Sequence, residues 1–123
     1  MAKQELLITL TADDRDANNV TIAFTMALKA LEKGHDARIM LLSNAVHIGQ
    51  KGFADKIDIG APFKPIKELL PKYMEQGGKI DVCSSCMKHN GIEESEIIEG
   101  ADIIQADDVV DALMTADKTL QLN

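Results

Sequence analysis

The fold follows from the pattern of residues 5–42, which read ELLITLTADDRDANNVTIAFTMALKALEKGHDARIMLL. Its two ends, ELLITLT (5–11) and ARIMLL (37–42), are short apolar runs typical of strands that are buried on both faces. Between them, apolar residues recur at helical spacing over residues 17–33, and Gly34 suits the end of that helix. A strand, a helix and a second strand joined by short loops indicate a parallel β-α-β unit.

The same alternation continues along the rest of the sequence. We expect further strands at 79–83, 102–105 and 118–122, and helices at 45–51, 65–76, 84–89 and 108–116, with an acidic helical turn at 93–99. Pro71 predicts a kink or a split in the 65–76 helix, and Asp107 is expected to cap the 108–116 helix. These elements predict an α/β fold with a mostly parallel five-stranded sheet covered on both faces.

Composition limits what the protein can be. A chain of 123 residues has the size of one domain, so we expect residues 1–123 to form a single domain with a buried core. Thirteen basic and twenty acidic residues give a net charge of −7, which disfavours binding to nucleic acid.

No apolar run is long enough to span a membrane, and the stretch at residues 6–10 is too short for a signal peptide. We therefore expect a cytoplasmic protein whose two cysteines are thiols, a redox pair or metal ligands rather than a structural disulfide.

Both cysteines lie in the stretch IDVCSSCMKHNGI, residues 80–92, at a predicted junction between a strand and a helix. Ligands of parallel α/β folds bind at the carboxyl ends of the strands, which is where this junction lies. Cys83 ends the strand and Cys86 falls in the first turn of the helix, where unpaired backbone N–H groups, such as those of Ser84 and Ser85, favour a thiolate. The pair is the main candidate for chemistry, although two cysteines that only pack in the core fit the same positions.

Three chemistries fit the spacing of the pair. A C-x-x-C pair can form a disulfide, as in thioredoxin-like proteins, but no tryptophan precedes this one and no proline follows its first cysteine. With His89 the motif becomes C-x-x-C-x-x-H, which offers three metal ligands but lacks the fourth that a closed zinc site needs. The third chemistry is sulfur transfer, in which a reactive thiolate holds a sulfane sulfur as a persulfide.

Weaker candidates follow the first two predicted strands. His47 follows the second strand and could reach the cysteine pair, although a histidine at this position also fits a structural role. Asn44, with Ser43, suits the cap of a short helix better than a substrate ligand, and we keep it as a secondary candidate. The aspartates at 13, 14 and 16 fit helix caps better than a metal site.

Along nearly its whole length, about residues 4–122, the sequence resembles the small DsrE/DsrF-like proteins, relatives of the sulfur-relay subunits of the Dsr and Tus systems. The resemblance rests on the segments LLITLT, ALKALEKGHDARIMLL, AVHIGQKGFADKI, ELLPKYMEQGGKIDVCSSCMKHNGI and ADKTLQL. It implies a three-layer α/β/α fold that assembles into oligomers, and it matches Cys83 to the cysteine that accepts and passes on sulfur. Cys86 has no counterpart in those relay subunits, and Asn90 stands where the family often has a basic residue.

The sequence thus predicts a cytoplasmic sulfur carrier or sulfurtransferase-like protein that holds sulfane sulfur as a persulfide on Cys83, with Cys86 as the second thiol. The candidate substrate-binding residues are Ser84, Ser85, His89, Asn44 and His47. We expect no metal and no other cofactor, a homo-oligomer, and a partner protein that donates or accepts the sulfur. The alternative is a non-catalytic oligomeric module that binds a metal or another ligand through the cysteine pair.

Overall fold

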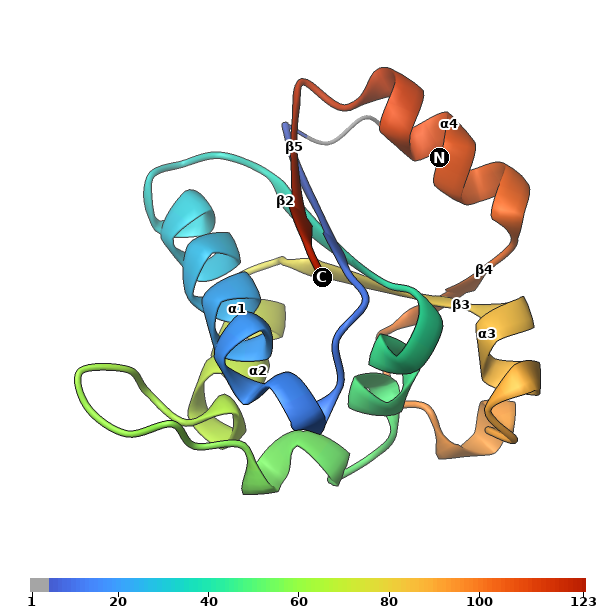
Figure 1. Cartoon of the computed structure of the whole chain (residues 1–123). Coiled ribbons are helices and arrows are strands. Elements are labelled where there is room, and N and C mark those ends of the chain that lie inside the picture. The colour runs from blue at the N-terminus through green and yellow to red at the C-terminus, as the bar shows by residue number, and fades with distance from the viewer. Residues whose placement is uncertain (1–4) are drawn as a thin grey trace.

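The computed structural model describes residues 5–123 (Figure 1). Met1–Gln4, on which part of the expectation about a signal peptide rests, lie outside that range. The described chain contains five strands, β1 (Leu6–Leu10), β2 (Ala37–Leu41), β3 (Lys79–Cys83), β4 (Asp102–Ile104) and β5 (Lys118–Leu122). Its α-helices are α1 (Ala17–Glu32), α2 (Ile66–Glu75), α3 (Ser84–His89) and α4 (Ala106–Thr115). Its short 3-10 helices are η1 (Asp14–Asp16), η2 (Ser43–Gly49), η3 (Phe53–Lys56) and η4 (Glu94–Glu96).

The five strands form one sheet in the order β4-β3-β2-β1-β5, and every neighbouring pair is parallel. The prediction of a mostly parallel five-stranded sheet is therefore confirmed. Because the strands run in the same direction, their carboxyl ends lie at the same end of the sheet. In the central pair, Ile39 of β2 lies beside Ile80 of β3, and Leu41 lies beside Val82. This register brings the segments that follow β2 and β3 next to each other.

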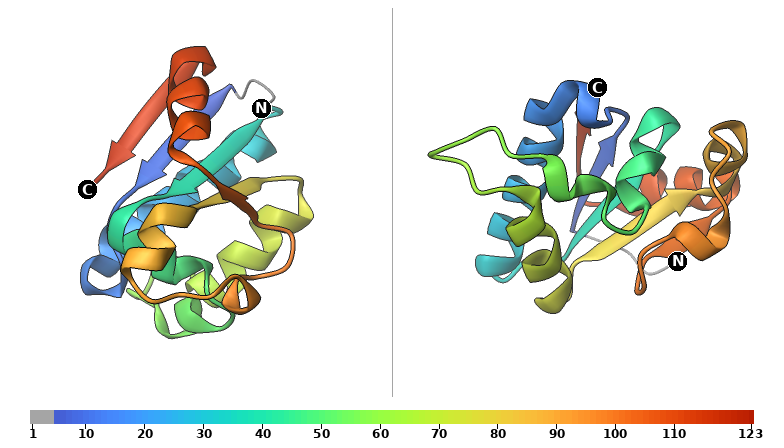
Figure 2. Two further views of the ribbon diagram at one scale, coloured as in Figure 1. Left: turned by 90° about the vertical axis from the view of Figure 1, so that its right-hand side faces the viewer. Right: turned by 90° about the horizontal axis from the view of Figure 1, so that it is seen from below.

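Helices cover both faces of the sheet, which confirms the three-layer α/β/α architecture (Figure 2). α1 and α2 pack on one face, over the apolar side chains of Ile8, Leu10, Ile39, Leu41, Ile80 and Val82. α4 crosses the other face on its way from β4 to β5, over a smaller apolar cluster of Leu7, Met40, Ile104 and Ala112. Within residues 5–123, none of the helices is long and apolar enough to cross a membrane.

Two helices differ from their predictions for identifiable reasons. α2 runs without a break through Pro71, so the predicted split is wrong. Buried side chains on either side of the proline, Leu69 and Tyr73, hold both halves of the helix in place. α4 begins two residues earlier than predicted, because Gln105 rather than Asp107 is its N-cap and the Gln105 N–H donates to the Asp108 carboxylate at 3.0 Å.

Two of the three aspartates after β1, Asp13 and Asp16, are helix caps, as predicted, whereas Asp14 pairs with Lys56 at 3.1 Å. The Asp13 carboxylate accepts the backbone N–H of Arg15 at 2.9 Å, and the Asp16 carboxylate accepts that of Asn19 at 3.2 Å. A hydrogen bond from the Arg15 guanidinium lowers the pKa of Asp13. These carboxylates therefore begin η1 and α1.

Tyr73 fixes α2 against the sheet. Its ring is fully buried and meets Phe24 of α1 edge-on, with ring centroids 6.0 Å apart. Its hydroxyl donates to the carbonyl oxygen of Lys79 at 2.7 Å and lies 3.1 Å from that of Ala37. Gly78 borders the ring so closely that a Cβ there would lie 2.3 Å from its carbons. Tyr73 thus joins both helices of this layer to the beginnings of β2 and β3.

An ion pair between β2 and β3 is buried on the opposite face. The Arg38 guanidinium donates to the Asp81 carboxylate, and 5% and 0% of these residues are exposed. Burial raises the pKa of Asp81, while the hydrogen bond from Arg38 opposes that shift. Asp81 Oδ2 and Arg38 Nε are buried and have no hydrogen-bond partner within residues 5–123.

Replacing Tyr73 with Phe should lower the free energy of unfolding by about 1–2 kcal/mol, because it removes a buried hydrogen-bond donor and leaves the apolar contacts in place. Urea unfolding measures the change. The slope of the unfolding free energy against urea concentration should stay the same. Met26→Leu, at an exposed residue of α1, is the control and should stay within about 0.5 kcal/mol of the unaltered protein. Equal unfolding midpoints for Tyr73→Phe and the unaltered protein would contradict this role of the hydroxyl.

Candidate functional site

Cys83 and Cys86 lie where the carboxyl end of the sheet meets α3. Cys83 is the last residue of β3 and the N-cap of α3, and Cys86 lies in the first turn of that helix, as the sequence predicts. Both cysteines are free. Cys83 is 7% exposed, whereas Cys86 is only partly buried. The two thiols therefore differ in how readily a reagent reaches them.

The segment that follows β2 supplies a hydrogen bond to this pair. The backbone N–H of Ser43 donates to the sulfur of Cys86 at 3.2 Å. Ser43 has a φ of 54°, in the left-handed region that residues other than glycine rarely adopt. A strained backbone of this kind persists only where the surrounding structure holds it. At Ser43 the strained conformation directs the amide toward Cys86.

The prediction that Ser43 and Asn44 cap a helix is wrong. Leu42 is the N-cap of η2, and no side chain caps that helix. Within residues 5–123 the partly buried Asn44 side chain makes no hydrogen bond. Instead of capping a helix, Ser43 contacts α3 through its backbone N–H.

Four effects set the pKa of the Cys86 thiol, and their sum raises it. Burial raises the pKa most, and the hydrogen bond with Cys83 and the charge of Cys83 raise it further. The Ser43 N–H lowers it, because this hydrogen bond stabilises the thiolate. The expectation that the start of a helix favours the thiolate therefore fails at Cys86, where burial outweighs the N–H donor.

His47 contacts α3 through Asn90. One ring nitrogen of His47 lies 3.2 Å from Asn90 Oδ1, and the other lies 3.1 Å from Gln50 Oε1. The Asn90 side chain in turn donates to the carbonyl oxygen of Cys86 at 2.8 Å. The His47 ring also stacks on Phe53, with ring centroids 5.5 Å apart. His47 is thus held beside the helix that carries Cys86, and its reach to the cysteine pair stays a prediction.

The remaining predicted residues of α3 have different surroundings. Ser84 is buried, and its hydroxyl donates to the side-chain oxygen of Gln105 at 3.0 Å, which links α3 to the start of α4. Ser85 and His89 are exposed. Nowhere in residues 5–123 do three His, Cys, Asp or Glu side chains gather as they would around a metal ion, so His89 does not join the two cysteines in a three-ligand set.

Sequence reasoning missed the roles of Ser43 and Asn90. Asn90, which precedes Gly91, stands out in the sequence only because the resembled family often has a basic residue there, but its side chain connects His47 with Cys86. The N-G pair is a recognisable turn signal, and it marks the place without indicating the side-chain contacts. Ser43 carries no such signal, because serine has no preference for a positive φ.

Comparison with known proteins identifies related sequences and structures. The sequence model of the DsrE/DsrF-like family matches residues 4–122. The uncharacterized protein MK0008 of Methanopyrus kandleri is 30% identical over 99 residues, which cover 80% of this chain and 77% of that protein. The uncharacterized protein MJ0989 of Methanocaldococcus jannaschii is 31% identical over 98 residues, 80% of this chain and 82% of that protein.

Two solved structures share the fold. The crystal structure of the YchN protein from E. coli matches with a TM-score of 0.80 and 23% sequence identity, over 96% of this chain and 98% of that one. The protein of unknown function MTH1491 from Methanobacterium thermoautotrophicum matches with a TM-score of 0.69 and 13% identity, over 98% of this chain and 99% of that one. At these identities the likeness concerns the fold alone.

Replacing Ser43 with Pro should raise the pKa of the Cys86 thiol further, because proline has no N–H and cannot adopt a positive φ. Ser43→Gly keeps the N–H and the left-handed backbone and should leave the pKa unchanged. Cys83→Ala should lower it, because it removes a hydrogen bond that raises the pKa. The measurement is the rate of alkylation of Cys86 against pH, read by peptide mass spectrometry. Identical profiles for Ser43→Pro and Ser43→Gly would show that the amide does not act on the thiol.

Proposed function

The chain belongs to the DsrE/DsrF-like family, which is associated with sulfur relay, and we propose that it carries sulfane sulfur as a persulfide on Cys83, with Cys86 as the second thiol. The observation that supports this proposal most is the pair of free thiols at the carboxyl end of β3, one of which receives the N–H of Ser43. The nearly buried Cys83 can protect a bound sulfur from solvent, and the more exposed Cys86 lies within hydrogen-bonding reach of it.

In the first step the Cys83 thiolate attacks the outer sulfur of a donor persulfide, R–S–SH. A sulfur–sulfur bond forms on Cys83 while the sulfur–sulfur bond of the donor breaks, and the donor leaves as the thiolate R–S⁻. No net oxidation takes place. The amides of Ser84 and Ser85 are the first two in α3 and have no acceptor within the helix, so they would stabilise negative charge on the sulfur.

The persulfide then has two outcomes. The thiolate of an acceptor protein can attack the outer sulfur and take it, which leaves the Cys83 thiolate. Alternatively, the Cys86 thiolate attacks the inner sulfur, forms a Cys83–Cys86 disulfide and releases HS⁻, after which a dithiol reductant restores both thiols. Both routes begin with reduced thiols, so the proposal includes a reducing compartment, the cytoplasm.

Three further side chains complete the proposed site. His47 is held beside α3 by Asn90 and is positioned to contact a donor or acceptor. Asn44 and His89 contribute side chains that are not occupied by hydrogen bonds within residues 5–123. We propose that these three residues bind the substrate or the partner protein that carries it.

Incubating the freshly reduced protein with polysulfide should add one or more sulfur atoms to its intact mass. The Cys83→Ser variant should gain much less, because it lacks the accepting thiol and keeps only Cys86, whose pKa is raised. The Cys86→Ser variant should gain sulfur and keep it longer than the unaltered protein, because it cannot release the sulfur by forming the disulfide. Intact-mass spectrometry before and after incubation measures all three, and treatment with a dithiol should remove the added mass.

Sulfur uptake by Cys83→Ser at the level of the unaltered protein would overturn the assignment of Cys83. Circular dichroism of each variant serves as the folding control. A gain that depends on Cys86 instead would exchange the roles of the two thiols and contradict the proposal as stated.

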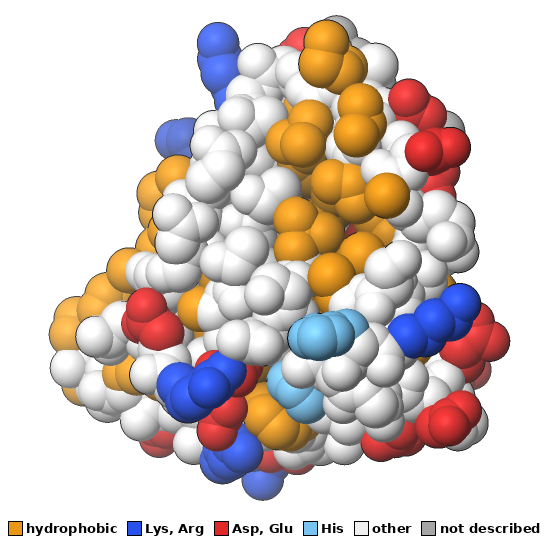
Figure 3. Space-filling model, turned by 45° about the vertical axis from the view of Figure 1, so that its right-hand side comes forward, with side chains coloured by type: hydrophobic (Ala, Val, Ile, Leu, Met, Phe, Trp, Pro, Cys, Tyr) orange, Lys and Arg blue, Asp and Glu red, His pale blue; other side chains and the backbone are white. Residues whose placement is uncertain are grey.

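We also propose that the chain forms a homo-oligomer through α4. Proteins of this family are often oligomeric. Figure 3 shows apolar side chains gathered in a band that runs down one face of the molecule from α4 toward histidine side chains. On α4, 57% of Val110, 38% of Leu113 and 80% of Met114 are exposed. Apolar surface of this kind is typical of protein–protein contacts, so a second copy of the chain is the proposed occupant.

Replacing Val110 and Met114 together with Glu should convert the oligomer to a monomer, because both side chains would place charge in an apolar contact. Light scattering coupled to size-exclusion chromatography gives the molecular mass in solution. Met26→Glu is the matched control, since Met26 is 49% exposed but lies on α1. A monomeric unaltered protein, or equal loss of the oligomer in the control, would contradict this contact.

A further inference from the structure

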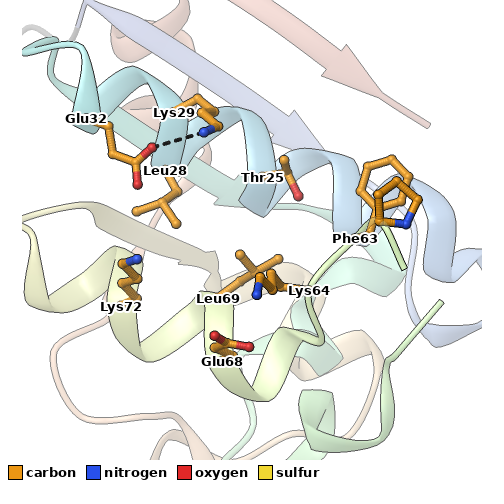
Figure 4. Close-up of a pocket in the computed structure, with 10 residues that line it drawn as sticks. Thr25, Leu28, Lys29, Glu32, Phe63, Lys64, Glu68, Leu69 and Lys72 are labelled. Carbon is orange, nitrogen blue, oxygen red and sulfur yellow. Dashed lines mark ion pairs between the residues drawn. The ribbon is translucent and has the colours of Figure 1, made fainter. Parts of the chain in front are cut away.

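A cavity of about 340 Å³ lies between α1, α2 and the loop that precedes α2 (Figure 4). Pockets that bind small molecules have volumes of roughly 300–1,000 Å³, and an engineered apolar cavity of ~150 Å³ holds benzene. None of the residues that line the cavity belongs to the cysteine site. The cavity is therefore large enough for a ligand of its own, separate from the proposed sulfur chemistry.

The walls of the cavity are mainly apolar. Leu28 of α1 and Leu69 of α2 both project into the space between the two helices, and only 7% and 5% of these residues are exposed. Pro62 and Phe63 line the cavity from the loop before α2, and 38% of Phe63 is exposed. An apolar ligand body would contact both leucines and remove part of the Phe63 ring from water.

Thr25 places an unused hydrogen-bonding group in the wall. Its hydroxyl oxygen is buried and has no partner within residues 5–123. By contrast, the hydroxyls of two other helical threonines donate to the carbonyl four residues earlier, Thr21 to Ala17 and Thr115 to Asp111, each at 2.8 Å. The Thr25 hydroxyl points from α1 into the space between the helices instead. A buried hydroxyl without a partner is unfavourable, and a polar atom of a ligand would supply one.

Charged side chains around the cavity leave an excess of positive charge. Lys29 pairs with Glu32 at 3.3 Å. Lys64 and Lys72 also line the cavity and have no ion-pair partner within residues 5–123. The one further carboxylate of the lining is that of Glu68. Two unpaired lysines against one carboxylate favour an anionic group over a cationic one.

We propose that this cavity binds a small amphipathic anion, with a compact aromatic or hydrocarbon body between Leu28, Leu69 and Phe63. The carboxylate of this ligand lies near Lys64 and Lys72, and one carboxylate oxygen accepts a hydrogen bond from the Thr25 hydroxyl. The proposal assigns to the α1–α2 layer a binding function that does not depend on either cysteine.

The probe for this proposal is 2-naphthoate, whose fluorescence anisotropy should rise on titration with the full-length protein and saturate at one molecule per chain. The double variant Lys64→Gln/Lys72→Gln should weaken binding about fivefold. Thr25→Val, which keeps the shape of the side chain and removes the hydroxyl, should weaken it about threefold to tenfold. Lys67→Gln is the matched control, because Lys67 lies exposed on α2 outside the cavity.

The neutral analogue 2-naphthamide should bind more weakly than 2-naphthoate. Cys83→Ser should bind 2-naphthoate as the unaltered protein does, which separates this test from that of the sulfur chemistry. Absence of saturable binding, equal affinity for the amide, or an equal loss in Lys67→Gln and the double variant would each overturn the proposal.

Discussion

The parallel pairing of β2 with β3 fixes the position of the groups at the candidate site. In this register Leu41 lies beside Val82. Three contacts between the two segments each join residues that are 43 apart in the sequence, namely Arg38–Asp81, Ser43–Cys86 and His47–Asn90. A slip of one residue in a strand turns its side chains to the opposite face of the sheet. Such a slip would separate Arg38 from Asp81 and move the Ser43 amide away from the Cys86 sulfur.

The buried ion pair between these strands is better understood as a constraint on register than as a source of stability. Taking two charges out of water is unfavourable unless they are paired and fully hydrogen-bonded. Asp81 Oδ2 and Arg38 Nε have no partner within residues 5–123, so the pair is not fully satisfied. Any register that parted the two charges would leave both buried and unpaired, which is far less favourable. We interpret the pair as selecting the one alignment in which the segments after β2 and β3 meet.

The elements that the sequence predicts well are those determined by local pattern. β3, α3 and β5 have the predicted bounds because each has a simple apolar periodicity and a clear end. The start of α4 was missed because a glutamine cap is a weaker signal than an aspartate. The conformation of Ser43 and the raised pKa of Cys86 arise from the packing of η2 against α3. Contacts between segments so far apart leave no pattern in either segment alone.

The crossover through α4 has a consequence for synthesis on the ribosome. β1 pairs with β2 on one side and with β5 on the other, and Thr11 meets Leu122 across 111 residues. The nascent chain can therefore form β1, α1 and β2 early, but β1 stays an open edge until α4 and β5 have emerged. Open edges of this kind invite pairing with other chains. Leu7 and Met40, which α4 covers, remain exposed over the same interval, so chaperone contact should last through most of translation and end when β5 pairs with β1.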